Sequence, residues 1–334
     1  MAKTNIGGKY LLRLGVHAGC NQRCLYCNPP GVWGKDIMSD EDLVETLVAA
    51  HSLGIRKVHL TGGEPLMRST LPEILGEAAA RGAKMEYYLT TNGAFLGKYA
   101  KGLRKNGVVR VNVSLDSLDP KTQAQLAQAK TLSGVLAGLS AAKGLFDSVK
   151  VNMVVMRNYN LGEIGDFIDY CQDNGFILRL MELLPFSTSE QPADFFFENH
   201  VSKRELEGIL RKFGKLRPAK VGGNNWACDY WLVGNRKLPI GIVYHHTRGY
   251  FCVKQRCESI RVGPGGELAA CYTQGAPSEN IKGLSLAGKK KTLAHAIAIK
   301  QKLEKGELKY PPYHIPEYLV FRANVRSGQW KGWT

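Results

Sequence analysis

The sequence predicts an α/β protein in which six strand–helix units form a partial TIM barrel, followed by a second, C-terminal lobe. Two observations support this fold. Short apolar runs alternate with amphipathic stretches through the first half of the 334 residues, and polar or glycine-rich motifs directly follow four of the runs. Alternation of this kind is typical of a parallel sheet, whose functional loops gather at the carboxyl ends of the strands.

Six apolar runs have the length and composition of strands. They are Tyr10 to Val16, Lys57 to Leu60, Met85 to Thr90, Val108 to Leu115, Val149 to Met156 and Ile177 to Leu184. Helical stretches are expected between them at Asp40 to Ser52 and Asn160 to Cys171, and a further amphipathic helix at Ser202 to Phe213. We therefore expect residues 1–185 to form the barrel core and residues 186–334 to form a connector and the second lobe.

Three cysteines follow the first run, in the segment GCNQRCLYC. The C-x3-C-x2-C spacing of Cys20, Cys24 and Cys27 places three thiols on one short loop. Iron–sulfur clusters are held by cysteine thiolates, and a four-iron cluster with three of them keeps one iron open to another ligand. A structural zinc site needs four ligands, and His17 is the single nearby imidazole. The spacing therefore favours an iron–sulfur cluster.

The cysteine content also indicates a cellular compartment. The chain has eight cysteines, an N-terminus without the pattern of a signal peptide, and no long uncharged apolar run. In a reducing compartment, clustered cysteines indicate metal binding or catalysis more often than disulfides. We expect a cytoplasmic protein.

Three further motifs follow predicted strands. They are Gly62-Gly63-Glu64-Pro65, Thr90-Thr91-Asn92-Gly93 and Ser114-Leu115-Asp116. Taken alone, the first is compatible with a simple turn and the last with a helix N-cap. Their order behind the cysteine loop makes coincidence improbable.

With these motifs in this order, the chain resembles the radical S-adenosylmethionine (SAM) superfamily over nearly its whole length. The resemblance implies that the open iron binds SAM and that an electron from the cluster cleaves SAM to a deoxyadenosyl radical, which abstracts a substrate hydrogen. It also implies that Gly62 and Gly63 let the backbone approach the methionine moiety, that Glu64 lies near its amino group and that Tyr26 contacts the adenine. Thr90, Ser114 and Asn152 stand where the family places further SAM contacts.

A second cysteine group, Cys252, Cys257 and Cys271, resembles the auxiliary-cluster region of MoaA, the GTP cyclase of molybdenum-cofactor biosynthesis. Thirteen residues separate the last two cysteines, and Gly263-Pro264-Gly265-Gly266 is typical of a hairpin turn between two strands. The resemblance implies a second 4Fe-4S cluster in a domain of the twitch or SPASM type. The first two cysteines, however, have four residues between them instead of the family's two. Cys228 is a candidate fourth ligand, although a buried thiol is the simpler interpretation.

The resemblance also implies a cationic substrate site made by Arg13, Lys57, Lys150, Arg179 and Arg261. A group of such charges is the expected receptor for a phosphate. The pattern is only partly kept: His59 stands where the family has an arginine, Glu258-Ser259 replaces an asparagine–arginine pair, and SGQWKGWT replaces the family's terminal Gly-Gly tail. We therefore expect a MoaA-like lyase that drives cyclisation or carbon–carbon bond formation on a phosphorylated nucleoside, with a reductant such as flavodoxin or ferredoxin.

Two alternatives remain open at this stage: an authentic GTP cyclase, and a radical SAM enzyme acting on peptide or RNA. The net charge of +16 supports an RNA partner, but the basic residues are scattered. One dense run, Lys289-Lys290-Lys291, precedes a predicted helix at Thr292 to Lys305 and is expected to form a solvated face. Nucleic-acid binding is therefore the weaker interpretation.

Overall fold

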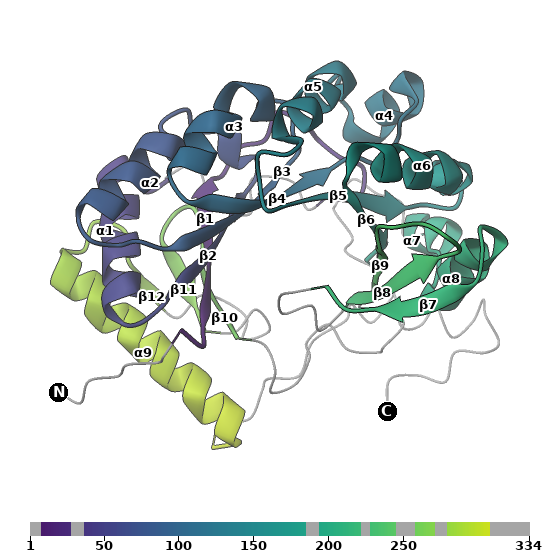
Figure 1. The fold of residues 1–334 in the computed structure, drawn as a ribbon. Helices are drawn as coiled ribbons and strands as arrows, with labels where there is room; N and C mark the ends of the chain where they lie inside the picture. Colours follow the sequence, from purple (N-terminus) through teal and green to yellow (C-terminus); the bar gives the residue numbers. More distant parts are fainter. Residues whose placement is uncertain are drawn as a thin grey trace.

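The fold was analysed in a computed structural model, which describes residues 8–27, 37–184, 194–221, 228–244, 258–270 and 279–307. Within these residues the strands form one twelve-stranded sheet in the order β12-β11-β10-β1-β2-β3-β4-β5-β6-β9-β8-β7. The sheet is curved, and helices α1 to α6 cover its convex side (Figure 1). The expected partial barrel is confirmed.

The middle of the sheet consists of six parallel strands, each hydrogen-bonded to the next along the chain. They are β1 (Leu11–His17), β2 (Lys57–Gly62), β3 (Glu86–Thr91), β4 (Val108–Ser114), β5 (Ser148–Val155) and β6 (Ile177–Glu182). The six runs expected from the sequence agree with these strands to within two residues at each end.

In the described part of the chain, six helices lie between the core strands, and three follow the last of these strands. The first six are α1 (Asp40–Ser52), α2 (Leu71–Ala80), α3 (Leu96–Lys105), α4 (Pro120–Ala127), α5 (Leu132–Ala142) and α6 (Ile164–Asn174), with 3-10 turns η1 (Pro65–Met67) and η2 (Leu161–Glu163). The last three are α7 (Phe195–Asn199), α8 (Lys203–Lys212) and α9 (Leu286–Lys305). Capping residues explain where two of the helices begin. Ser39 and Asp42 form a capping box at α1, and Ser202 and Glu205 form another at α8.

The remaining strands extend the sheet at both edges. On one side β9 (Ile240–Val243) runs parallel to β6 and continues into the antiparallel β8 (Cys228–Val233) and β7 (Leu216–Ala219). On the other side β10 (Ser259–Val262) runs parallel to β1, followed by β11 (Glu267–Ala269) and β12 (Glu279–Asn280). Segments far apart in the chain thus flank the same barrel. The domain boundary at residue 185 remains a prediction.

The predicted hairpin turn at 263–266 is confirmed between β10 and β11. The amide of Gly266 donates to the carbonyl of Gly263 at 3.0 Å, and Gly266 has a φ of +89° that favours glycine. In the sequence, Cys257 precedes β10 by two residues and Cys271 follows β11 by two. Both cysteines lie outside the described residues.

The core lies between the sheet and the helices. Alternate strand residues such as Leu12, Leu14, Val58 and Leu60 are fully buried in it. Because side chains alternate along a strand, the residues between them face the opposite side, which we call the concave face. Those residues are largely polar, so the concave face is the part of the barrel available for chemistry.

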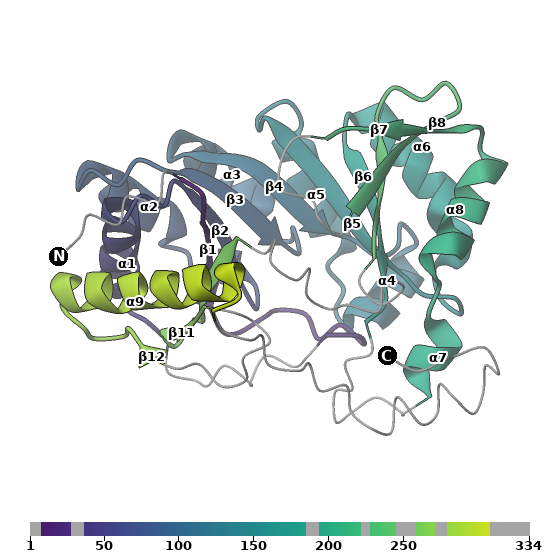
Figure 2. The ribbon, with the colours of Figure 1, turned by 90° about the horizontal axis from the view of Figure 1, so that it is seen from below.

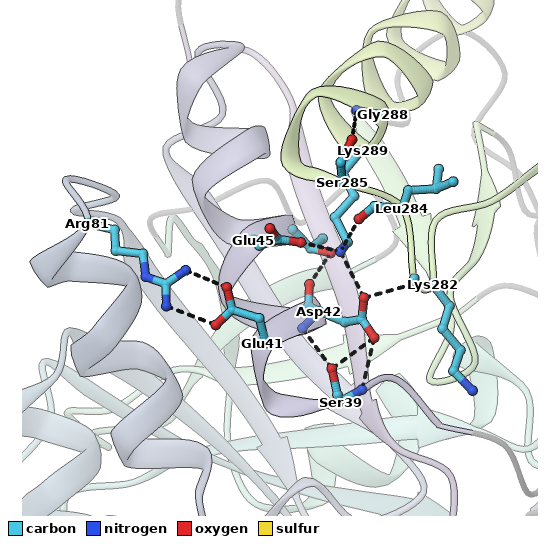
Figure 3. A network of polar contacts seen from close by, with 12 residues as sticks. Ser39, Glu41, Asp42, Glu45, Arg81, Lys282, Leu284, Ser285, Gly288 and Lys289 are labelled. Atoms are coloured by element: carbon cyan, nitrogen blue, oxygen red, sulfur yellow. Dashed lines mark hydrogen bonds and ion pairs between the residues drawn. The ribbon is translucent and has the colours of Figure 1, made fainter.

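Helix α9 packs along α1 at the edge of the barrel (Figure 2). Lys289 of α9 is 1% exposed, and its ammonium donates to Asp42 at 2.8 Å, Glu45 at 2.6 Å and the carbonyl of Leu284 at 2.7 Å (Figure 3). The expectation of a solvated face was therefore wrong for Lys289, because two α1 carboxylates neutralise its charge. The helix also begins at Leu286, six residues before the predicted start.

Among the described helices, none combines the length and the apolar character that crossing a bilayer requires.

Candidate functional site

Cys20, Cys24 and Cys27 lie on the loop that leaves the carboxyl end of β1, as predicted. Hydrogen bonds fix this loop from two sides. The amides of Arg23 and Leu25 donate to carbonyls at the end of α4 at 2.9 and 3.0 Å. On the other side, Nδ2 of Asn92 donates to Oδ1 of Asn21 at 2.7 Å. The loop is therefore held between α4 and the loop after β3.

The three thiols influence one another. Burial, the Asp116 carboxylate and the other two cysteines all raise the pKa of the Cys24 thiol above its ordinary value. Burial likewise raises the pKa values of Cys20 and Cys27, so a cationic partner is needed to hold the three groups as thiolates. Among the described residues, no three His, Cys, Asp or Glu side chains converge to hold a single metal ion. Three cysteines on one loop are the ligand set that a 4Fe-4S cluster with one open iron uses.

Gly62 and Gly63 bring the loop after β2 against the cysteine loop. A Cβ at Gly62 would lie 2.3 Å from the carbonyl oxygen of His17, and one at Gly63 would lie 2.3 Å from that of Gly19. The amides of Gly63 and Glu64 donate to these two carbonyls, each at 2.8 Å. The structure thus supplies a reason for both glycines that the sequence interpretation missed, namely the close approach of two backbones. Their contact with SAM remains a prediction.

Glu64 is 1% exposed, and its carboxylate accepts three hydrogen bonds. The donors are the amide of Leu66 at 2.9 Å, the hydroxyl of Thr91 at 2.7 Å and the amide of Asn92 at 2.6 Å. Burial raises its pKa, and these three donors act in the opposite direction. The Glu64 side chain therefore fixes the ends of β2 and β3 against each other, next to the cysteine loop.

Tyr26 is tied to Asp116, a residue that the sequence analysis noticed in its motif but did not select. The Tyr26 hydroxyl donates to Asp116 at 2.7 Å, and the other carboxylate oxygen accepts from the amide of Val154 at 2.9 Å. Burial raises the pKa of Asp116 to about 6. Asp116 lies just after β4, in the same motif as Ser114, and this position could have identified it as a site residue from the sequence. The pair orients the phenol beside the cysteine loop.

Thr90 belongs to a hydrogen-bonded row across β2, β3 and β4. Its hydroxyl accepts from Nδ2 of Asn112 at 3.1 Å and lies 2.7 Å from Nε2 of His59. Ser114, at the end of β4, is half-buried and lies beside Asn152 in the strand register. These predicted SAM contacts therefore share the concave face.

Cationic side chains surround His59 on that face. In the strand register Arg261, Arg13 and His59 lie side by side on β10, β1 and β2. Burial, followed by the charges of Arg13, Arg179 and Arg261, lowers the pKa of His59 to about 3. Arg179 reaches this group from β6, so its charge acts across the barrel. Three of the predicted arginines thus face one interior around a neutral imidazole.

Lys150 joins the same interior from β5. It is buried, and its ammonium donates to the Tyr230 hydroxyl of β8 at 3.1 Å. Burial and the charges of Arg179 and Arg110 lower the pKa of Lys150 to about 8. Tyr230 is not among the residues predicted from the sequence, because its approach to Lys150 depends on β8 joining the far edge of the sheet.

Cys228 lies on the same face of β8, two residues before Tyr230. A Cβ at Gly241 of β9 would lie 2.9 Å from the Cys228 sulfur, 2.8 Å from the Tyr230 ring and 3.2 Å from the Arg179 side chain. Glycine at 241 therefore leaves space for these three residues to meet. Burial raises the pKa of the Cys228 thiol, while Arg179 and Lys150 act to lower it. Its ligation of an auxiliary cluster remains a prediction.

Other predicted residues are placed differently. Lys57 lies at the amino end of β2, where its side chain is exposed and its backbone pairs in register with Leu11 and Glu86. It is not one of the cationic residues that act on His59. The auxiliary residues Cys252, Cys257 and Cys271 lie outside the described residues. The structure therefore brings together four of the five predicted cationic residues, Arg13, Lys150, Arg179 and Arg261.

Comparison with known proteins agrees with this geometry. The family model described as "Radical SAM superfamily" matches residues 15–171. A protein named GTP 3',8-cyclase from Moorella thermoacetica is 32% identical over 86% of this chain and 88% of its own length. The protein of that name from Peptoclostridium acidaminophilum is 32% identical, covering 78% of this chain and 79% of its own length. The protein of that name from Acidothermus cellulolyticus is 37% identical, covering 78% of this chain and 73% of its own length.

Solved structures share the fold at low sequence identity. Streptococcus suis SuiB, bound to S-adenosylmethionine, matches with a TM-score of 0.59 and 15% identity over 94% of this chain and 66% of that one. The protein anSMEcpe, with bound AdoMet and a peptide, matches with a TM-score of 0.57 and 17% identity over 84% and 79%. From the sequence relatives and the matching family model, the chain belongs to the radical SAM superfamily and is a MoaA-like radical SAM enzyme of the cyclase type.

Proposed function

We propose that this enzyme acts on a phosphorylated nucleoside and drives its cyclisation or the formation of a carbon–carbon bond. The observation that carries the proposal is the cationic group on the concave face, where Arg13, Arg179 and Arg261 act together on His59. Cations gathered in a partly buried interior are the expected receptor for phosphate. The relatives named GTP 3',8-cyclase support a nucleotide as substrate.

A 4Fe-4S cluster held by Cys20, Cys24 and Cys27, when bound, supplies the electron that cleaves SAM and so generates the hydrogen-abstracting radical. The chain's own groups orient the reactants. We infer that Tyr26, fixed by Asp116, contacts the adenine, and that Thr90, Ser114 and Asn152 line the SAM pocket. The backbone of Gly62, Gly63 and Glu64, held against the cysteine loop, faces the methionine moiety.

Arg179 links the two halves of this site. Its Nε donates to Oδ1 of Asn152 at 2.7 Å, and its charge lowers the pKa values of His59 and Lys150. A phosphate bound among these groups would lie next to the residues proposed to bind SAM. Such proximity is what hydrogen transfer between the two molecules requires.

We further propose a second 4Fe-4S cluster on Cys252, Cys257 and Cys271, in a domain that begins after residue 185. Two complete clusters predict about eight iron atoms per chain, and one predicts about four. Replacing Cys228 by alanine tests its ligation, because a ligand's loss lowers the iron content while a buried thiol's loss leaves it unchanged.

GTP itself is the second candidate substrate, because the relatives carry that name. Histidine in place of an arginine at 59 favours instead a nucleotide with fewer phosphates. The clustered cysteines suit a reducing cytoplasm, where a flavodoxin or ferredoxin would serve as electron donor.

The deciding experiment is anaerobic incubation of the reconstituted enzyme with SAM, dithionite and a series of nucleoside mono-, di- and triphosphates including GTP. Deoxyadenosine is measured together with the mass of each nucleotide. A nucleotide-dependent product with changed chemistry supports the proposal and identifies the substrate. Deoxyadenosine formation with every nucleotide unchanged would contradict it.

A further inference from the structure

Few acidic residues occur in the part of the chain that forms α3, α4 and α5. Residues 89–146 contain two carboxylates, Asp116 and Asp119; the first is buried, and the second caps α4 by accepting from the amide of Thr122 at 2.7 Å. The same stretch carries seven cationic residues on or beside helices α3, α4 and α5, namely Lys98, Lys101, Arg104, Lys105, Lys121, Lys130 and Lys143; of these, Arg104 is paired with Asp147 at 2.9 Å. Helices α3, α4 and α5, which cover one side of the barrel (Figure 1), therefore present a basic surface.

Part of this surface adjoins the three cysteines. Arg23, Phe95, Lys98 and Lys130, which we call the basic rim, are all exposed. Phe95 is 37% exposed and is one of four large apolar side chains that are exposed among the described residues. Arg23 lies within the cysteine loop itself.

Hydrogen bonds from the cysteine loop set the positions of the other three residues. Lys130 directly precedes Thr131, whose hydroxyl accepts from Nε2 of Gln22 at 2.7 Å. Phe95 and Lys98 follow Asn92, whose Nδ2 lies 3.8 Å from the Cys20 sulfur. The rim therefore has parts on two sides of the loop.

The starts of α3 and α5 lie against each other, which joins those two sides. A Cβ at Gly138 of α5 would lie 2.4 Å from the carbonyl oxygen of Gly93, and one at Gly134 would lie 3.1 Å from that of Ala94. Glycine at these positions lets the two helices approach closely. The residues of the basic rim therefore come from segments that pack against one another beside the cysteine loop.

We propose that the basic rim is the docking surface for an acidic electron-transfer protein that carries a flavin or an iron–sulfur group. The inference rests on the proposed function, in which each cleavage of SAM consumes one electron from outside the chain. The donor is oxidised by one electron each time, and the cluster held by the cysteine loop is reduced by one. Because electron transfer weakens with distance, the surface nearest the cysteines is where the donor must dock.

Charge complementarity favours this partner. Exposed positive side chains attract an acidic partner and orient it during encounter, chiefly by raising the association rate. Salt screens such attraction over about 8 Å at physiological ionic strength. RNA would be attracted by the same charges, so the experiment must separate the two partners.

The test uses the reconstituted full-length enzyme and a bacterial flavodoxin as probe. The double variant Lys98→Glu/Lys130→Glu is compared with Lys290→Glu/Lys291→Glu, which makes the same charge change at two exposed residues of α9. Flavodoxin binding is measured at 50 and 300 mM salt. SAM cleavage is measured with flavodoxin hydroquinone and, separately, with dithionite, which needs no docking surface.

We expect the rim variant to bind flavodoxin about tenfold or more weakly at low salt, with a smaller difference at high salt. Its flavodoxin-driven SAM cleavage should fall by a similar factor while dithionite-driven cleavage is kept. Equal losses in the α9 variant would overturn the proposal, since net charge alone would explain them. Unchanged binding in the rim variant, or a lost affinity for a probe RNA with flavodoxin binding intact, would also overturn it.

Failure of this inference is distinguishable from failure of the proposed function. Dithionite-driven SAM cleavage that changes no nucleotide contradicts the proposed function. Dithionite-driven turnover of a nucleotide, with flavodoxin affinity insensitive to the rim substitutions, contradicts only the docking surface.

Discussion

The Nε atom of Arg179 donates a hydrogen bond to Oδ1 of Asn152 across 2.7 Å, from β6 to the neighbouring β5. The sequence placed one of these residues at the substrate and the other at SAM. Their contact makes the two proposed binding regions adjacent parts of one interior. An interaction of this kind couples the occupancy of one region to the geometry of the other.

Replacing Arg179 by alanine should therefore weaken nucleotide binding more than SAM binding. Loss of a charge-assisted contact to phosphate costs about 1.5–3 kcal/mol, which corresponds to roughly a ten- to hundredfold loss of affinity. Titration calorimetry with the nucleotide and with SAM measures both affinities. Arg204→Ala, at an exposed position of α8, is the matched control. Equal weakening by the two variants would refute a phosphate-binding role for Arg179.

The neutral state of His59 should make the protein less stable in mild acid. Its pKa is about 3 in the folded chain against about 6.5 when unfolded. Because the unfolded state binds the extra proton, stability from this group is complete above pH 6.5 and is lost as pH falls toward 3. Between pH 7.5 and 5.5 the loss is about 1.4 kcal/mol.

Urea unfolding at these two pH values, compared with His59→Gln, measures this contribution. The variant should lose less stability between them than the parent chain does. If both lose the same amount, His59 is protonated in the folded state and the cationic group around it is more open than its burial indicates.

The buried ion group at Lys289 should be needed to hold α9 against α1. Lys289→Met leaves Asp42 and Glu45 without their shared partner, and we expect a loss of about 2 kcal/mol, since both carboxylates keep some contact with solvent. Lys290→Met, at the exposed neighbouring position, should change stability by less than about 0.5 kcal/mol. Urea unfolding of both variants tests this difference.

Acid should weaken the same ion group. Hydrogen bonds from Lys289, Gly283 and Ser39 outweigh the effect of burial and lower the pKa of Asp42 to about 2. Its contribution to stability is therefore present above its unfolded value near pH 4 and is lost as pH falls toward 2. In Lys289→Met this part of the pH dependence should shrink, which urea unfolding at pH 5 and pH 3 would show.

Gly63→Ala should prevent cluster assembly while leaving the barrel folded. The added Cβ would lie 2.3 Å from the carbonyl oxygen of Gly19, so the cysteine loop must move away from the loop after β2. Gly162→Ala, where nothing lies within 4 Å of the added carbon, is the control. Iron content and far-ultraviolet circular dichroism after anaerobic reconstitution separate the two effects. Normal iron binding by Gly63→Ala would show that the two loops need not touch.

The sequence by itself determined the features that depend on local order along the chain. The six core strands follow from runs of apolar residues, and α1 follows from the helical period of the stretch between the first two runs. Cys20, Cys24 and Cys27 are close because only a few bonds separate them, so any fold of this segment brings them together. The loops after β2, β3 and β4 followed from the rule that parallel strands end at one edge of a sheet.

Only the tertiary structure decided which distant residues meet. Lys150 and Tyr230 are 80 positions apart, and Asp42 and Lys289 are 247 apart. Their contacts depend on where β8 and α9 join the barrel, and no local pattern encodes that choice. Burial then changed the chemistry of these groups: it removed Lys289 from solvent, kept His59 neutral and gave Gly63 its steric role. Removal from water and the approach of other charges, both created by folding, are the physical reasons.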